Sequence, residues 1–224
     1  MARALLSSAL GLIVCLGIPN SAAADRSVQS LNGRWEFQRE GADSWKTVIV
    51  PRSFEAHEGV DFDGVGIYRR RFPPVKLSDG ARAILHFQAV ATECEVSVDG
   101  QRVATHLGGW TPFRIDITDR LRAGSPGQPH ELVVRVDEKV GHNSQGFLPI
   151  VAPHFGGIWQ DVQLLIVPRR WIDDRQLLSV GDPATGSVHL EIPVRGSAGE
   201  SPIEIDVRYR LWCTKWWSPT RTVV

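Results

Sequence analysis

Sulfur-containing residues are scarce in this chain, which has three cysteines and one methionine among 224 residues. So few cysteines exclude a small secreted protein that depends on a disulfide scaffold. Cys94 lies in line with Val96 and Val98, and this pattern predicts a small side chain buried on the inner face of a strand. Sequence spacing does not define a disulfide between Cys94 and Cys213, because pairing depends on side-chain geometry.

An excess of charge of one sign is also absent. The chain has 25 basic and 25 acidic residues, and the runs Arg69–Arg71 and Arg169–Arg170 are short. Without the basic stripe that competes for phosphate backbones, the sequence argues against a nucleic-acid partner. The seven histidines lack metal-ligand spacing, and nucleophile-elbow, phosphate-loop and dinucleotide motifs are missing. The sequence therefore predicts no metal site and no cofactor.

A single long apolar run is present, at the N-terminus. Arg3 precedes the apolar residues 4–18, Pro19 breaks the run, and Ala22–Ala24 offers a small-residue cleavage site. Residues 1–24 therefore read as a signal peptide, which predicts a secreted or periplasmic protein with no membrane contact after cleavage. The run is shorter than the ~20 residues of a membrane span. An alternative is a lipoprotein signal lipidated at Cys15, although Val14 is bulkier than such a site requires.

Strand patterns dominate the remainder. Leu132, Val134 and Val136 alternate with polar or exposed positions, and Asp99-Gly100 predicts a tight hairpin. Long amphipathic helical stretches are missing, and residues 119–122 offer a single turn at most. Further strands are predicted at 34–39, 47–50, 67–72, 83–90, 93–98, 101–106, 113–117 and 162–166. The predicted core includes Trp35, Phe87, Val98, Phe113, Val134 and Leu164.

Pro168 is the expected boundary between two domains. Beyond it, residues 176–180, 187–194 and 203–211 read as three strands separated by turn residues. They would begin an immunoglobulin-like sandwich, which needs about 100 residues and seven strands. We therefore expect one β-sandwich at residues 25–168, followed at 169–224 by an incomplete immunoglobulin-like domain with an atypical tail.

Residues 99–118 form a more specific motif. They read Asp-Gly-Gln-Arg-Val-Ala-Thr-His-Leu-Gly-Gly-Trp-Thr-Pro-Phe-Arg-Ile-Asp-Ile-Thr. This resembles the signature of glycoside hydrolase family 2, in which an Asn-Gly hairpin precedes His-x-Gly-Gly-aromatic-x-Pro-Phe and an Asp-Ile/Val-Thr strand end. Four further segments match the family in order and spacing, so that the resemblance covers residues 28 to 168: Leu31–Phe37, Gly66–Phe72, Leu132–Asp137 and Gly156–Val162.

The resemblance implies an all-β fold of the jelly-roll, galactose-binding-like type, with carbohydrate as the partner. In the family this domain is non-catalytic and walls the active site of a barrel that carries both catalytic glutamates. The resemblance thus implies the carbohydrate-binding N-terminal part of an O-glycosyl hydrolase, truncated before its barrel, with no catalytic residue in this chain. Two alternatives stay open: a free-standing secreted carbohydrate-binding module and a non-catalytic interaction domain.

The motif itself reads mainly as structural. Gly108-Gly109 allows backbone conformations closed to other residues, so that Trp110 and Phe113 can fold onto the sandwich. Asp116 and Thr118 are placed to satisfy backbone donors at the strand end. The family-motif residues in this chain are Gly100, His106, Gly108, Gly109, Trp110, Pro112, Phe113, Asp116, Gly156, Gly157 and Ile158. Candidate sugar contacts are the loop residues His142, Asn143 and His154, at the end that faces the active site in the family.

Carboxylate pairs for glycoside hydrolysis are not evident. Glu93 and Glu95 share one strand face, but it is opposite Cys94 and reads as the solvated one. The pairs Asp61/Asp63 and Asp173/Asp174 read as turn residues in polar loops. Residues 149–155 lack the carboxylate with which well-known family members reach the sugar, and Ala91 replaces the Asn of galactosidase-like members, which places galactoside specificity in doubt.

Overall fold

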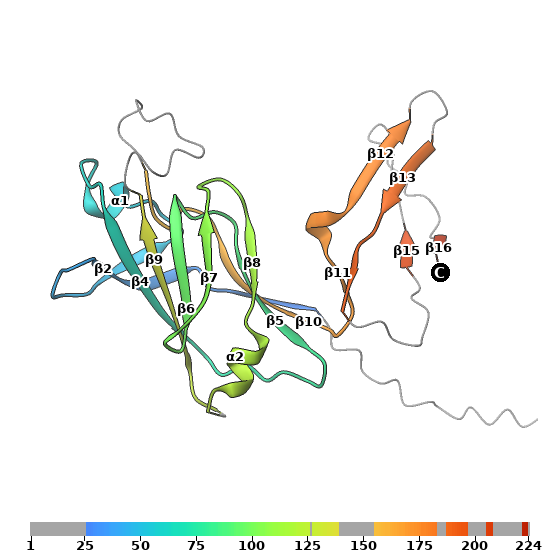
Figure 1. Ribbon diagram of the computed structural model, residues 1–224, viewed down its shortest axis with the longest axis horizontal. Helices are drawn as coiled ribbons and strands as arrows, with labels where there is room; N and C mark the ends of the chain where they lie inside the picture. The colour runs from blue at the N-terminus through green and yellow to red at the C-terminus, as the bar shows by residue number, and fades with distance from the viewer. Residues whose placement is uncertain are drawn as a thin grey trace, which may run out of the picture. The chain divides into compact units, whose positions relative to one another are not determined.

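The computed structural model describes residues 26–125, 127–138, 155–182, 187–196, 205–207 and 221–223 (Figure 1). The chain divides into two compact units, residues 1–168 and 169–224. The division falls at Pro168, where the strand pattern of the first unit ends.

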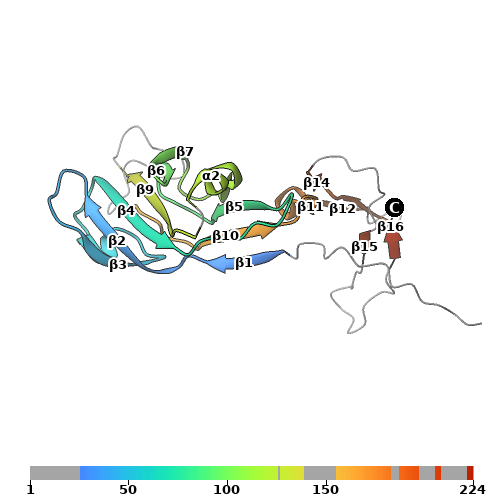
Figure 2. The same ribbon diagram turned by 90° about the horizontal axis from the view of Figure 1, so that it is seen from below.

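The first unit is built from two antiparallel sheets. The larger sheet has the order β3-β2-β4-β9-β6-β7, with bounds Lys46–Val50, Gly33–Arg39, Val65–Phe72, His130–Asp137, Glu93–Val98 and Gln101–Leu107. The smaller sheet has the order β1-β10-β5-β8, with bounds Ser27–Ser30, Val162–Val167, Arg82–Phe87 and Phe113–Asp116. Strands β1 and β10, from the two ends of the unit, lie side by side (Figure 2).

The core forms where the inward faces of the two sheets meet. In β9 the alternating residues Leu132, Val134 and Val136 are fully buried, as the period of two predicts. Cys94 is buried as a free thiol, and burial raises its pKa to about 12, so the expected small buried hydrophobe is confirmed. The six predicted core residues are all buried: Trp35, Phe87, Val98, Phe113, Val134 and Leu164. The all-β sandwich predicted from the sequence is confirmed.

The Asp99-Gly100 turn joins β6 to β7 as predicted. Both residues have positive φ, 49° and 77°, which is the backbone of a type I′ hairpin. The Asp99 carboxylate also accepts a hydrogen bond from the Glu131 amide at 2.8 Å and lies 2.8 Å from Nδ1 of His130. The turn is therefore fixed to the start of β9 as well as to its own strands.

The end of β8 behaves as its residue types suggest. Oδ1 of Asp116 accepts hydrogen bonds from the amide and the hydroxyl of Thr118, at 3.0 and 2.6 Å. The Thr118 hydroxyl in turn accepts from the Ala83 amide at 2.9 Å, which ties β8 to β5. The short helix α2, Thr118–Ala123, follows at the position of the predicted turn.

A second short helix, α1 (Glu55–Glu58), was not expected from the sequence. It is anchored by Phe54, whose fully buried ring stacks on Tyr68 at 5.8 Å between ring centroids. Four residues are too few to show a helical period, so tertiary packing alone defines this turn. In the part of the chain that the structure describes, no helix is long and apolar enough to cross a membrane.

The described residues of the second unit form three two-stranded antiparallel ladders. They pair β11 with β14, β12 with β13 and β15 with β16, with bounds Trp171–Ile172, Val194–Arg195, Leu178–Asp182, Ser187–Glu191, Ile205–Val207 and Arg221–Val223. A 3-10 turn, η1 (Asp174–Gln176), precedes β12. The strand predicted over 187–194 is divided before Val194, and β16 lies in a tail where no strand was predicted.

Asp173 begins a turn as expected, because its carbonyl accepts a hydrogen bond from the Gln176 amide at 3.0 Å, but its side chain is buried. Its side chain is 6% exposed, and its carboxylate lies 3.4 Å from Nε of Arg195 and 3.8 Å from Nε of Arg175. The two guanidinium groups compensate the charge of the buried carboxylate, so Asp173 serves as a buried ion-pair partner within the second unit.

Candidate functional site

Two family-motif segments that are distant in sequence meet on the surface of the first unit. The indole Nε1 of Trp159 donates a hydrogen bond to the carbonyl of Gly109 at 2.9 Å, across 50 residues of sequence. Trp110, Phe155 and Trp159 then pack edge to face, with ring centroids 5.0 to 5.3 Å apart. We call these three side chains the aromatic cluster.

The cluster is partly open to solvent. The side chain of Trp110 is 50% exposed, and Phe155 and Trp159 are half-buried. Trp110 packs on Phe155 and Trp159 and keeps half of its side chain exposed, so it lies on the surface of the sandwich and not in the core. Phe113, from the same motif, is buried as expected.

A stack of three rings lies next to the loop that carries Trp110. His106 stacks on Phe113 with centroids 4.0 Å apart, and Phe113 stacks on Phe87 at 4.9 Å. Nε2 of His106 lies 3.1 Å from the carbonyl oxygen of Gly108, where an Nε2–H donates to it. Burial lowers the pKa of His106 and so favours the neutral ring that stacks in this way. Gly108 has φ +129°, a conformation that L side chains rarely adopt.

The Gly156-Gly157-Ile158 segment forms the other side of the site. Gly157 has φ +97° and forms an isolated bridge with Ala91. A Cβ at Gly157 would lie 2.6 Å from the hydroxyl oxygen of Tyr68, so no side chain fits. Ile158 is fully buried. These glycines therefore allow the chain to pass close to the core immediately before it presents Trp159.

A pair of carboxyl groups lies beneath Gly156. Glu138, directly after β9, is only 4% exposed, and Oε1 of Glu55 accepts a hydrogen bond from the Gly156 amide at 3.2 Å. Oε2 of each glutamate is buried without a hydrogen-bond partner among the described residues. Burial and the neighbouring charge of Glu55 raise the pKa of Glu138 to about 8. Glu138 therefore keeps its proton to a higher pH than an exposed glutamate does.

Sequence reasoning missed this pair, although it searched for neighbouring carboxylates. The two residues are 83 positions apart and come from a short helix and a strand end, so no spacing pattern connects them. Gly156 packs on the Glu138 carboxyl so closely that even a Cβ there would collide with it. Glu138 is almost fully buried, and Glu55 accepts the Gly156 amide, so the pair packs against the backbone that leads to Trp159.

The other candidate residues are distributed as follows. Cys94 is buried on β6, whereas Glu93 and Glu95 lie on the opposite face, where Glu95 pairs with Arg102 at 3.2 Å. Asp61 and Asp63 are exposed. The predicted sugar contacts His142, Asn143 and His154 lie outside the described residues. Among the described residues, no three His, Cys, Asp or Glu side chains are arranged to hold a metal ion.

The first unit is similar to a known domain family and to known enzymes. Residues 19–168 match the model of glycosyl hydrolases family 2, sugar binding domain. A β-galactosidase of Thermoanaerobacter pseudethanolicus is 29% identical over 65% of this chain and 20% of its own length. A β-glucuronidase of Bacteroides fragilis is 24% identical over 82% of this chain and 28% of its own. The chain thus spans less than a third of either relative.

A solved structure agrees with the sequence relatives. The FMN-binding β-glucuronidase from Facaelibacterium prausnitzii L2-6 superposes with a TM-score of 0.60 and 29% identity, over 75% of this chain and 28% of that one. The five ordered motifs, the two-sheet fold and the family model all concern the same segment of the chain. This chain belongs to glycoside hydrolase family 2, and residues 19–168 are its sugar-binding domain.

Proposed function

We propose that the first unit binds carbohydrate without cleaving it, and that the aromatic cluster is its contact surface. The observation that carries the proposal is the exposure of Trp110 within a cluster of three rings built by two family motifs. Flat aromatic faces suit the apolar C–H faces of sugar rings, and an indole retains a polar N–H for orientation.

The support beneath the cluster favours a binding role over simple surface packing. The His106–Phe113–Phe87 stack and the Trp159–Gly109 hydrogen bond hold the rings in place before any ligand arrives. Preorganised rings lose little side-chain entropy on binding. A half-exposed Trp supported by so many contacts has no evident role in stabilising the core.

The biological setting follows from the family. The relatives are named as β-glucuronidases and β-galactosidases, which supports a role beside the active site of an enzyme that acts on β-linked sugars. The same surface would serve a free-standing binding module. Export through the leader at residues 1–24 would bring the domain to extracellular or periplasmic polysaccharides.

Isothermal titration with a neutral β-linked oligosaccharide, β-1,4-galactotetraose or cellotetraose, tests the proposal. We expect the dissociation constant to rise about tenfold in Trp110→Ala, which corresponds to about 1.4 kcal/mol. Trp110→Tyr, which keeps a ring, should retain most of the affinity. Trp171→Ala, in the second unit, is the matched control and should bind like the wild type. Equal affinity in all four proteins, or no binding of any saccharide, would contradict the proposal.

A further inference from the structure

Strands β2 and β4 separate at one end of the larger sheet. Their hydrogen-bonded register runs from Arg39↔Gly66 to Glu36↔Arg69 and stops there. Beyond this point, β2 continues to pair only with β3, and β4 continues to pair only with β9. Nη1 of Arg70 spans the gap and donates to the carbonyl oxygens of Asn32 and Arg34, at 3.0 and 3.1 Å.

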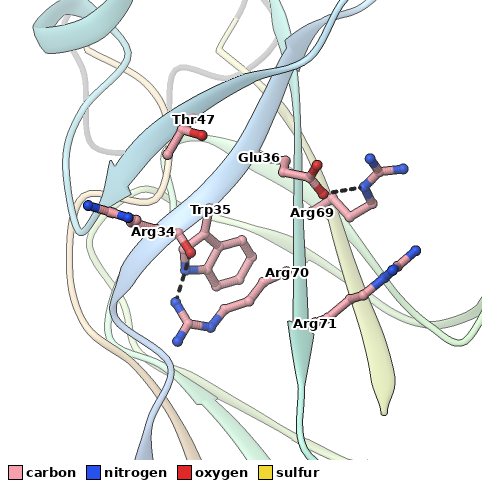
Figure 3. A pocket seen from close by; sticks show the side chains of 7 residues that line it. All are labelled: Arg34, Trp35, Glu36, Thr47, Arg69, Arg70 and Arg71. Atoms are coloured by element: carbon pink, nitrogen blue, oxygen red, sulfur yellow. Dashed lines mark hydrogen bonds and ion pairs between the residues drawn. The ribbon is translucent and has the colours of Figure 1, made fainter. Parts of the chain in front are cut away.

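The separation leaves a cavity of about 350 Å³, which we call the arginine notch (Figure 3). Figure 3 shows Arg70 on the side of Trp35, whereas Arg69 and Arg71 extend from the other side of β4. The lining residues are Arg34, Trp35, Glu36, Thr47, Arg69, Arg70 and Arg71. The lining thus carries four arginines and one carboxylate, and that carboxylate, Glu36, is paired with Arg69.

The charges of the notch do not balance. Glu36 pairs with Arg69 at 2.8 Å, and Arg71 lies 3.5 Å from the carboxylate of Glu131, with both side chains partly exposed. Within the described part of the chain, Arg34 and Arg70 have no carboxylate within ion-pair distance. Two of the four positive charges are left without an anion.

Among these arginines, Arg70 has the most buried and least compensated guanidinium group. Its Nε is buried without a hydrogen-bond acceptor in the described structure, and burial lowers the pKa of its guanidinium. The contacts to Asn32 and Arg34 explain why one arginine bridges the separated strands. They do not explain why three more arginines gather around the same cavity, since like charges at close range repel one another.

An oxyanion would resolve the imbalance. The guanidinium fork matches the two oxygens of a carboxylate or a sulfate, and paired donors bind such groups more strongly than neutral hydrogen bonds do. An aromatic face stands next to the cations, because the guanidinium carbon of Arg69 lies 4.1 Å from the centre of the Trp45 ring. Cationic donors beside a half-buried indole suit an acidic sugar ring.

We propose that the arginine notch binds an anionic group carried by a glycan, either the carboxylate of a uronic acid or a sulfate ester. This inference rests on the proposed carbohydrate-binding function but uses a different surface. The notch lies at the Arg70–Phe72 end of β4, whereas Glu138 and the segment before Trp159 adjoin the other end, where Val65 pairs with Asp137. The domain would then contact one glycan chain at two places, or two chains at once.

Titration at about 50 mM salt with three tetrasaccharides tests the inference: a tetrauronate, a sulfated galactan fragment and neutral β-1,4-galactotetraose. The test variant is Arg34→Gln with Arg71→Gln, since neither arginine supports the strand gap. The control is Arg102→Gln, which removes a positive charge elsewhere on the same sheet. We expect at least tenfold weaker binding of the acidic saccharide in the double variant, a change below twofold in the control, and an affinity that falls with added salt.

The outcomes separate the two proposals and the two ligand sources. Preference for the uronate or for the sulfated fragment identifies the anion. Unchanged affinity of the double variant for the acidic saccharides overturns the notch, even if Trp110→Ala abolishes binding of the neutral one. If no saccharide binds at all, the proposed function fails. The notch is then judged by whether sodium sulfate raises the melting temperature of the wild type more than that of the double variant at matched ionic strength, and equal shifts overturn it.

Discussion

Glu138 shows how the position of one residue determines its chemistry. It is the first residue after β9, and it lies beneath Gly156 with Glu55 as its neighbour and Asp63 adding negative charge nearby. An acid whose pKa is higher in the folded than in the unfolded state binds its proton more tightly when folded. Its contribution to stability is full below its ordinary pKa of 4.5 and is lost as the pH rises through about 8.

We therefore expect Glu138→Gln to change the pH dependence of stability. The amide has the same shape and carries no charge, so the variant should be more stable than the wild type at pH 9, on the order of 2 kcal/mol. The difference should shrink toward pH 5, where the wild-type group holds its proton. Urea unfolding from pH 5 to 9 measures this, with Glu93→Gln, an exposed carboxyl, as the control. A constant difference across that range would contradict the raised pKa of Glu138.

Single residues also mark the limit of sequence reasoning in this domain. Phe113 and Cys94 could be placed in the core because alternation along a strand is a local property. The exposure of Trp110 could not be inferred, because it depends on Phe155 and Trp159 occupying the space beside it. The Glu55–Glu138 pair was missed for the same reason, since neither residue carries a local sign of its partner.

Elements with a strong local signal were predicted well. The Asp99-Gly100 hairpin and the strand β9 were correct because turn chemistry and a period of two act over a few neighbouring residues. The arginine notch was not predicted, although Arg69–Arg71 stood out as a basic run in the sequence. Its cause is the separation of β2 from β4, which depends on how each strand pairs with a third.

The hairpin offers a test at this scale. Asp99→Ala removes the acceptor of the Glu131 amide and the partner of His130, and it places alanine at positive φ. We therefore expect the free energy of unfolding to fall by about 1–3 kcal/mol. Asparagine adopts positive φ readily and keeps one acceptor oxygen, so Asp99→Asn should lower the free energy of unfolding by less. Asp79→Ala, at an exposed turn, should be nearly neutral. Urea unfolding measures the free energy of unfolding of each variant, and an Asp99→Ala protein as stable as the wild type would show that the Asp99 contacts contribute little.

The whole chain combines two units of unequal construction. The first has a four-stranded and a six-stranded sheet around a continuous core, whereas the second is described as three ladders of two strands each. Two-stranded ladders are marginally stable by themselves. The exposed apolar side chains of the second unit agree with this: Ile172, Leu177, Leu178, Val180 and Leu190.

Limited proteolysis should therefore cut the second unit first. We expect a resistant fragment that ends near Pro168–Trp171, because local unfolding of a two-stranded ladder costs less free energy than opening the sandwich. Mass spectrometry of a time course identifies the fragment. If residues 172–196 persist for as long as the sandwich does, the second unit is better packed than its ladders suggest.

The pairing of β1 with β10 has a consequence for how the first unit can be joined to other proteins. Ser27 lies opposite Ile166, so the chain enters and leaves the sandwich at one place. A domain whose ends are adjacent can be inserted into a surface loop of another protein, or circularly permuted with a short connecting peptide, without stretching either end. The first unit is therefore suited to domain insertion and to circular permutation.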